Sequence, residues 1–180
     1  MEQPDYIKAV RKWVESVVID LQLCPFAAKV YLRQGVRFIY STADSEEALL
    51  MHLHDELGLI EQDGSIDTTL LIHPHVLKSF EDYNQFLSTA DELLEEMGLA
   101  GKFQIASFHP DYQFADTAYE DVENFTNRSP YPILHILNED DVTKAIDAYP
   151  DIHSVPERNQ QHLRALGPGK MKALLKSCFS

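Results

Sequence analysis

Residues 68–98 read TTLLIHPHVLKSFEDYNQFLSTADELLEEMG, a short apolar run closed by a proline and followed by a long amphipathic segment. The β-branched and aliphatic composition of the first run predicts a strand over residues 68–74. After Ser79, apolar side chains recur at helical spacing until Gly98, at Tyr83, Phe86, Leu87, Ala90, Leu93, Leu94 and Met97. A strand that leads directly into a helix is the building unit of folds with helices packed on a sheet.

The rest of the chain alternates in the same way. Further strands are predicted at VRFIYST (36–42), KFQIASFHP (102–110) and YPILHILN (131–138). Helices are predicted over 5–23, from Ala27 to Gly35, from Asp44 to Gly58, over 139–149, from Ser154 to Gly167 and over 170–177. We therefore predict an α/β (or α+β) fold with one domain over residues 1–180. It should have a single sheet of about four strands, at least partly parallel and covered by helices.

Composition limits the partners of the protein. The 180 residues include 15 Lys and Arg against 29 Asp and Glu, a net charge of −14. Such a field repels nucleic acid and anionic membranes, and no apolar run is long enough to span a bilayer. With only Cys24 and Cys178, a disulfide scaffold is not expected. We expect free thiols, a cytoplasmic location and a small-molecule ligand; the sequence carries no signal of oligomeric state.

The segment 109–131, HPDYQFADTAYEDVENFTNRSPY, has no regular pattern and separates two predicted strands. Irregular segments this long are usually either functional or disordered, and its aromatic residues argue against disorder. We expect a helical turn between Ala118 and Phe125. Because strands fix both ends, the segment should fold back on itself and place His109, Asp116, Asn127 and Arg128 around one cleft.

Three predicted strands carry histidine, at His73, His109 and His135. The carboxyl ends of strands in open sheets form ligand crevices, which favours His73 and His109 as site residues. Imidazole serves as an acid or base near neutral pH and as a ligand for zinc or iron, so these three histidines are candidate ligands for a divalent metal. Asp116 could complete either kind of site. For His135, inside an apolar strand, the alternative is a hydrogen-bonded core residue.

Cys24 precedes Pro25, a residue favoured at the first position of a helix. Unpaired N–H groups at a helix start favour the thiolate, which is the nucleophile and the metal ligand. The alternative for Cys24 is packing as a small buried hydrophobic residue.

Arg128 is the only basic residue between Lys102 and Lys144. A guanidinium on a stiff turn is suited to hold a carboxylate or phosphate through two parallel hydrogen bonds. Asn127, Ser129 and Tyr112 would supply further polar contacts to such a ligand. The structural alternative is that Arg128 ties the segment down through nearby acids, namely Glu120, Asp121 or Glu123.

Four motifs together resemble one family. They are LCPFA (23–27), FHPDYQFAD (108–116), TNRSPYPILHIL (126–137) and PERNQQHLRALG (156–167). The chain resembles the domain-of-unknown-function family 1415 of bacterial and plant proteins over nearly its whole length. This resemblance implies a small, soluble, single-domain protein and no particular activity. The matching positions are Cys24, Pro25, His109, Tyr112, Asp116, Asn127, Arg128, Ser129, Tyr131 and His135.

These features lead to one functional hypothesis and two alternatives. The hypothesis is an enzyme, with hydrolases among the candidate classes, that acts on a small anionic metabolite. Its catalytic residues would be His109, Cys24 and Asp116, and its substrate-binding residues would be Arg128, Asn127, Ser129 and Tyr112. The alternatives are a module that binds a small ligand or metal without catalysis, and an acidic protein that binds a basic partner.

Overall fold

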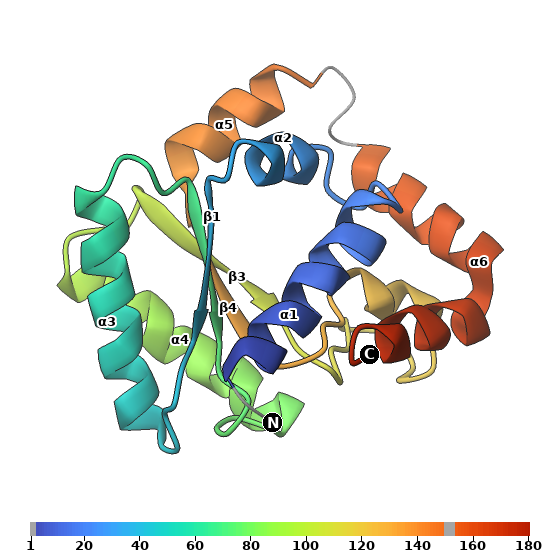
Figure 1. Ribbon diagram of the computed structural model, residues 1–180, viewed down its shortest axis with the longest axis horizontal. Coiled ribbons are helices and arrows are strands. Elements are labelled where there is room, and N and C mark those ends of the chain that lie inside the picture. Colours follow the sequence, from blue (N-terminus) through green and yellow to red (C-terminus); the bar gives the residue numbers. More distant parts are fainter. Residues whose placement is uncertain (1–2, 150–153) are drawn as a thin grey trace.

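The computed structural model describes residues 3–149 and 154–180, which form a four-stranded sheet with helices on both faces (Figure 1). The strands are β1 (Val36–Tyr40), β2 (Thr68–Ile72), β3 (Phe103–Phe108) and β4 (Ile133–Asn138), in the order β1-β2-β4-β3. β1 and β2 are parallel, whereas β4 lies antiparallel to both β2 and β3. The predicted mixed α/β architecture with a partly parallel sheet is thus confirmed.

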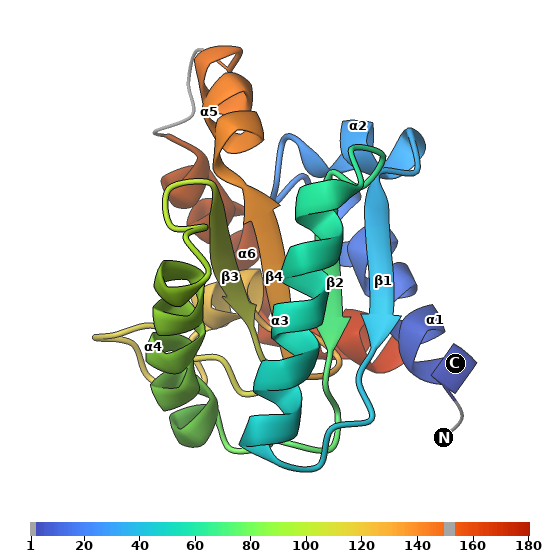
Figure 2. The same cartoon turned by 90° about the vertical axis from the view of Figure 1, so that its left-hand side faces the viewer.

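Two helical layers enclose the sheet. One face is covered by α3 (Glu46–Gln62) and α4 (Phe80–Glu96), which lie in front of the strands in Figure 2. The other face is covered by α1 (Gln3–Trp13), its π-helical continuation η1 (Val14–Ile19) and α6 (Val155–Ser177). The short helices are α2 (Ala27–Leu32), the 3-10 helix η2 (Val122–Thr126) and α5 (Glu139–Asp147).

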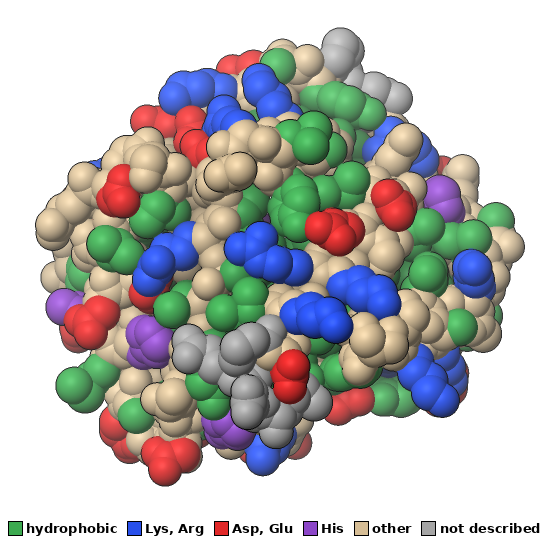
Figure 3. Space-filling view, viewed as in Figure 1, with side chains coloured by type: hydrophobic (Ala, Val, Ile, Leu, Met, Phe, Trp, Pro, Cys, Tyr) green, Lys and Arg blue, Asp and Glu red, His purple; other side chains and the backbone are tan. Residues whose placement is uncertain are grey.

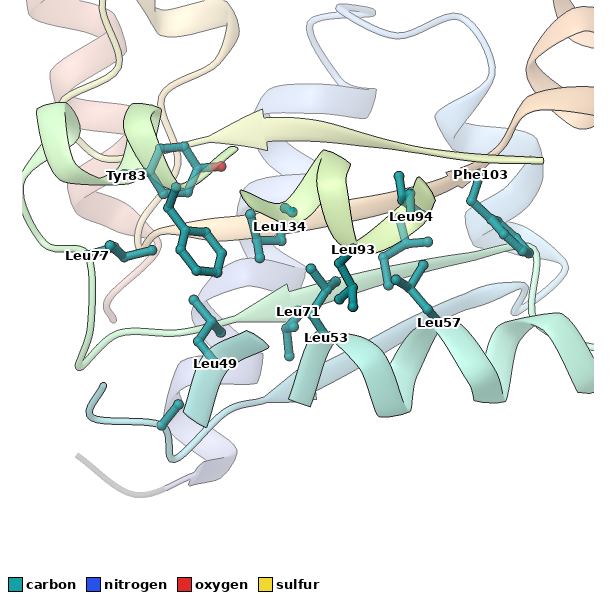
Figure 4. Packing of buried hydrophobic residues seen from close by; sticks show 14 of the residues in the cluster. Leu49, Leu53, Leu57, Leu71, Leu77, Tyr83, Leu93, Leu94, Phe103 and Leu134 are labelled. Atoms are coloured by element: carbon teal, nitrogen blue, oxygen red, sulfur yellow. The ribbon is translucent and has the colours of Figure 1, made fainter. Parts of the chain in front are cut away.

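Strand alternation divides the apolar side chains between these layers. Leu71 and Leu134 point toward α3 and α4, where Leu53 and Leu93 meet them (Figure 4). Leu70, one position along β2, belongs to the core under α1 and α6. Successive strand residues face opposite sides of a sheet, so a nearly unbroken apolar strand serves two cores.

The helix boundaries test the predicted caps. Ser79 caps α4 and Asn138 caps α5, since their side chains accept hydrogen bonds from Asp82 N and Asp141 N. The predicted start of α3 at Asp44 is wrong by one position, because Ser45 Oγ accepts from Ala48 N at 3.2 Å.

The predicted end of α3 at Gly58 is also wrong, because the helix continues to Gln62. Ile60, beyond that glycine, is buried in the core. Burying such a side chain gains about 1.5–3 kcal/mol. This gain offsets the cost of about 1 kcal/mol for a glycine inside a helix.

The chain between α1 and β1 also differs from expectation. α2 begins at Ala27 as predicted, whereas the helix start at Pro25 that the hypothesis for Cys24 assumed is wrong. Cys24 lies in the turn before α2, where its carbonyl accepts from Ala27 N at 3.4 Å. Cys24 is therefore three positions ahead of the first helical residue, and the N-cap of α2 is Phe26, not Cys24.

Charge is distributed unevenly over the two helical layers. Residues 41–102, which contain α3 and α4, carry fourteen Asp and Glu but only Lys78 and Lys102. Lys and Arg side chains gather instead over α1 on the opposite layer (Figure 3). The net charge of −14 thus belongs mainly to the α3 and α4 side. In the part of the chain that the structure describes, no helix is long and apolar enough to cross a membrane.

Candidate functional site

The segment 109–131 folds back as predicted, and its two ends are joined by main-chain hydrogen bonds. His109 N donates to Asn127 O at 3.2 Å, and Ser129 N donates to His109 O at 3.4 Å. The helical turn of the segment is η2, which begins four residues later than predicted and ends at Thr126. The segment is therefore a compact ordered loop anchored at the end of β3.

Asn124, which the sequence analysis did not single out, holds the interior of this loop. It is fully buried, and its Oδ1 accepts from Phe114 N at 3.0 Å and from Thr117 Oγ1 at 2.9 Å. Its Nδ2 donates to Ala118 O at 2.8 Å. A carboxamide that bridges main-chain groups in this way replaces the hydrogen bonds that regular structure would supply.

Arg128, like Asn124, is buried and holds the loop together through main-chain groups. Only 3% of the residue is exposed, and its Nε and Nη2 donate to Tyr112 O at 3.1 Å and Tyr119 O at 2.6 Å. The guanidinium carbon also lies 4.4 Å from the centre of the Tyr119 ring and 4.8 Å from that of Phe125. Two donors of the guanidinium and two aromatic rings near it are thereby engaged within the loop. Arg128 ties the loop down, as the structural alternative expected, but through carbonyls and rings.

His109 is fully buried at the start of the loop. Its Nδ1 accepts from Asp111 N at 3.0 Å, so Nε2 carries the proton and donates to Leu77 O at 3.2 Å. Burial lowers the pKa of His109, which favours this neutral form. Both ring nitrogens are occupied, an arrangement suited to fixing the turn after β3.

His73 and His135 are held in the sheet. The Nδ1 of His73 contacts Val76 O at 3.2 Å, and burial lowers its pKa to about 3. The Thr68 hydroxyl donates to Ile136 O, so the Nε2 of His135 must donate to Thr68 Oγ1, 2.7 Å away. Burial lowers the pKa of His135 to about 4. His135 therefore lies in the core and has a specific hydrogen-bond partner, Thr68.

Of the remaining predicted site residues, Ser129 and Tyr112 lie beside His109 and Arg128, whereas Cys24 and Asp116 share no hydrogen bond with His109 within the described residues. Cys24 is a half-buried free thiol, and Asp116 is exposed at a positive φ of 63°. Ser129 donates to Tyr131 O at 2.6 Å, and the ring of Tyr112 packs 5.0 Å from that of Phe80. Among residues 3–149 and 154–180, no hydrogen bond or ring contact joins Cys24, Asp116 and His109, and no group of three His, Cys, Asp or Glu is placed to hold a metal ion.

One pocket lies beside the loop, between η2 and the first turns of α6, and we call it the η2–α6 pocket. Its volume is about 320 Å³, at the lower end of the range for small-molecule sites. Among the residues that the structure describes, no Lys or Arg lines it. The lining residues are Phe114, Glu123, Thr126, Asn127, Val155, Pro156, Asn159 and Gln160.

Two carboxamides in this pocket are fixed in the same manner. Asn127 Nδ2 donates to Ser107 O at 3.0 Å, and Asn159 Nδ2 donates to Leu23 O at 2.8 Å. In the described part of the chain, neither Oδ1 has a hydrogen-bond partner. Each amide is thus oriented by the main chain and keeps its acceptor oxygen and one of its two N–H donors available. Only 9% of Asn159 is exposed, so its acceptor lies at a buried position of the wall.

Glu123 adds a third acceptor. Arg164 from α6 reaches it through Nε and Nη2, and both nitrogens bind the same oxygen, Oε1. Within the described residues, Oε2 is left without a partner. Lys172 makes a second link between α6 and the loop, at 2.8 Å from Glu120 Oε2. Two ion pairs therefore hold the loop against α6 along one side of the pocket.

The family model for the family described as "Protein of unknown function (DUF1415)" matches residues 5–173. The chain belongs to this family. Neither a curated protein nor a solved structure matches the chain.

In this DUF1415 member, the four motifs that suggested the family meet around the η2–α6 pocket. Phe114, Asn127 and Asn159 come from three of them and line the pocket. The fourth, LCPFA, supplies the Leu23 carbonyl that orients Asn159. The motif residues His109 and Arg128 instead build the loop that carries Asn127. The motifs therefore divide into residues that shape the pocket and residues that face it.

Proposed function

We propose that this DUF1415 protein binds a small polar molecule in the η2–α6 pocket. The observation that carries the proposal is the pair of carboxamides, Asn127 and Asn159, each anchored through Nδ2 and each with an unpartnered Oδ1 at the pocket. Oriented acceptors are the polar groups by which small-molecule sites fix the position of a ligand. Preorganisation also lowers the entropic cost of binding, since these side chains are already ordered.

The proposal favours ligand binding without catalysis over the enzyme hypothesis. His109 has both ring nitrogens engaged, and Arg128 has its donors directed at carbonyls of its own loop. A general base needs to reach the proton that it abstracts, and an anion clamp needs a free fork of donors. Among the described residues, no Lys or Arg lines the pocket, and its carboxamides offer both acceptors and N–H donors. It therefore suits an uncharged polar ligand better than an anionic one.

The test is an amide-detected NMR titration with a panel of small sugars, amides, amines and nucleosides. Binding in the pocket should shift the side-chain NH₂ signals of Asn127 and Asn159. Gln160→Trp, at the exposed edge of the pocket, should block these shifts. Gln161→Trp is the matched control, because Gln161 is the next residue on the helix and is not part of the wall. The proposal would be overturned if no compound of the panel shifted the two Asn signals. It would also be overturned if Gln160→Trp bound a ligand as tightly as the wild type does.

A further inference from the structure

The loop 109–131 covers the end of the outer edge of β3. β3 is a terminal strand of the sheet and pairs with β4 along its inner edge (Figure 2). Just after the strand, His109 N donates to Asn127 O and Ser129 N donates to His109 O, main-chain bonds of the kind that pair strands. Asn127 Nδ2 also donates to Ser107 O at 3.0 Å. The loop therefore occupies this edge from Ser107 to His109.

Ile105 and Ser107 direct main-chain groups toward the same edge. Phe108 N donates to the Tyr83 hydroxyl at 3.0 Å, and this hydroxyl donates at 2.7 Å to Ile133 O, the register partner of Phe108 on β4. Phe108 thus faces β4. Because successive strand residues direct their N–H and C=O groups to opposite edges, Ser107 and Ile105 face outward. Within the described residues, no hydrogen bond is made by Ile105 N, Ile105 O or Ser107 N.

Such an edge selects an extended chain as its partner. A peptide in strand conformation carries N–H and C=O groups at the spacing of β3, and strand addition to an open edge is a common mode of peptide recognition. On the face of β3 away from α4, Gln104 is exposed and Ala106 is partly exposed, so solvent reaches this part of the strand. A partner strand therefore has access to Ile105 and Ser107.

The charge beside this edge decides between two kinds of extended partner. α4 packs next to β3, with Leu94 beside Phe103 in Figure 4, and it carries six Asp and Glu but no Lys or Arg. All six are exposed, namely Glu81, Asp82, Asp91, Glu92, Glu95 and Glu96. Antiparallel pairing of two copies of this chain along β3 would place both α4 helices on one face of the joined sheet, where their like charges repel. A basic segment is instead attracted by the same charges.

We propose that the outer edge of β3 binds an extended, basic segment of another protein. The segment pairs with the main chain of Ile105 and Ser107 and directs Lys or Arg side chains toward α4. This surface goes beyond the proposed function, because neither residue lines the η2–α6 pocket and no ligand is needed there.

The probes are the blocked peptide KVKVK, its acidic counterpart EVEVE, and KVKVK with every main-chain nitrogen methylated. Binding is followed by the amide NMR signals of Ile105 and Ser107 and by their rates of hydrogen exchange. In the free protein these two amides should exchange faster than that of Ala106, which faces β4. KVKVK should slow their exchange and bind about ten-fold or more tightly than its methylated form, which cannot donate hydrogen bonds from its main chain. EVEVE should bind more weakly than KVKVK by a similar factor, because α4 repels it.

Two matched double variants test the role of α4. Glu95→Gln combined with Glu96→Gln should reduce the preference for KVKVK over EVEVE, since these acids lie in the last turn of α4, near the start of β3. Glu46→Gln combined with Glu47→Gln on α3, the helix farther from β3 in Figure 2, should leave the preference unchanged. Melting temperatures establish that both variants are folded. An equal loss of preference in the two variants would contradict the role of α4.

The remaining outcomes decide the rest of the proposal. Equal binding of KVKVK and its methylated form would overturn strand addition, and equal binding of EVEVE would overturn the basic partner. Absence of KVKVK binding would overturn the proposal as a whole. Sedimentation equilibrium tests the second copy as the occupant, and we expect a monomer. A dimer that protects the amides of Ile105 and Ser107 would show that the edge serves self-association instead.

Discussion

At the scale of single residues, Arg128 shows how a cation can act in a strongly acidic chain without pairing with an acid. An irregular loop leaves main-chain carbonyls without the partners that a helix or strand would provide. The planar guanidinium has five donors, enough to serve the Tyr112 and Tyr119 carbonyls from one buried position. The sequence reveals that Arg128 is isolated. It does not reveal its partners, because every residue carries a carbonyl and none is marked.

This role predicts a large effect of Arg128 on stability. Arg128→Ala should lower the free energy of unfolding by about 2–4 kcal/mol, since two loop carbonyls lose the donors of a buried guanidinium and two rings lose a nearby cation. Arg128→Lys should recover only part of this loss, because an ammonium lacks the planar fork. Urea unfolding measures both. Arg158→Ala is the control, because Arg158 is exposed and, within the described residues, its one hydrogen bond is to the Tyr149 hydroxyl. A loss as small as that of the control would return Arg128 to the candidates for ligand binding.

At the scale of elements, the sequence predicted every strand and most helices, because apolar periodicity and caps are local signals. It failed where tertiary packing outweighed a local signal. Gly58 looked like a helix end, but the buried Ile60 keeps α3 helical beyond it. Pro25 looked like a helix start, but α2 begins at Ala27. The bounds of the helical turn in the loop were also wrong, since a 3-10 helix of five residues, η2, has too little periodicity to fix where it begins.

α6 is interrupted at Gly167, and substitutions at the two glycines there, Gly167 and Gly169, should change stability in opposite directions. Gly167 has φ 77° and ψ 160°, a conformation that is essentially restricted to glycine, whereas Gly169 lies in the helix that follows. Nothing within 4 Å would obstruct a Cβ atom at either position. Gly167→Ala should therefore destabilise the protein by about 1–3 kcal/mol through backbone strain. Gly169→Ala should stabilise it by about 0.5–1 kcal/mol. Chemical denaturation of the two variants checks both signs, and a stabilising Gly167→Ala would show that the break can straighten.

At the scale of the whole molecule, the pocket depends on contacts that sequence patterns do not encode. Asn127 and Asn159 face one cavity only because a loop after β3 and the start of α6 pack together. Which oxygen of each amide remains available is decided by main-chain carbonyls of Ser107 and Leu23, in two other elements. Sequence patterns predicted Asn127 as a site residue and put Asn159 only inside a helix from Ser154 to Gly167. These patterns could not bring them together, since nothing local links residues this far apart in the chain.

The three buried histidines make stability depend on pH in one direction. Burial lowers the folded-state pKa to about 3 for His73 and to about 4 for His135, and it lowers that of His109 as well. In the unfolded chain, a histidine titrates near its usual value of about 6.5. Between these values the unfolded state binds a proton that the folded state excludes. Stability is therefore complete above about pH 6.5 and is lost as the pH falls toward the folded-state values.

His135 permits a clean measurement of this effect. Because folded His135 does not bind a proton, this residue should make the free energy of unfolding about 2 kcal/mol lower at pH 5 than at pH 7. The side chain in His135→Gln can still donate to Thr68 Oγ1 but does not titrate. From pH 7 to pH 5, the free energy of unfolding of this variant should therefore fall by about 2 kcal/mol less than that of the wild type. His54→Gln is the control, because 58% of the His54 side chain is exposed. Urea unfolding at pH 7 and pH 5 gives both differences. Equal pH dependence in the wild type and His135→Gln would mean that His135 takes up its proton in the folded state, which requires water to reach a ring that the sheet now holds neutral.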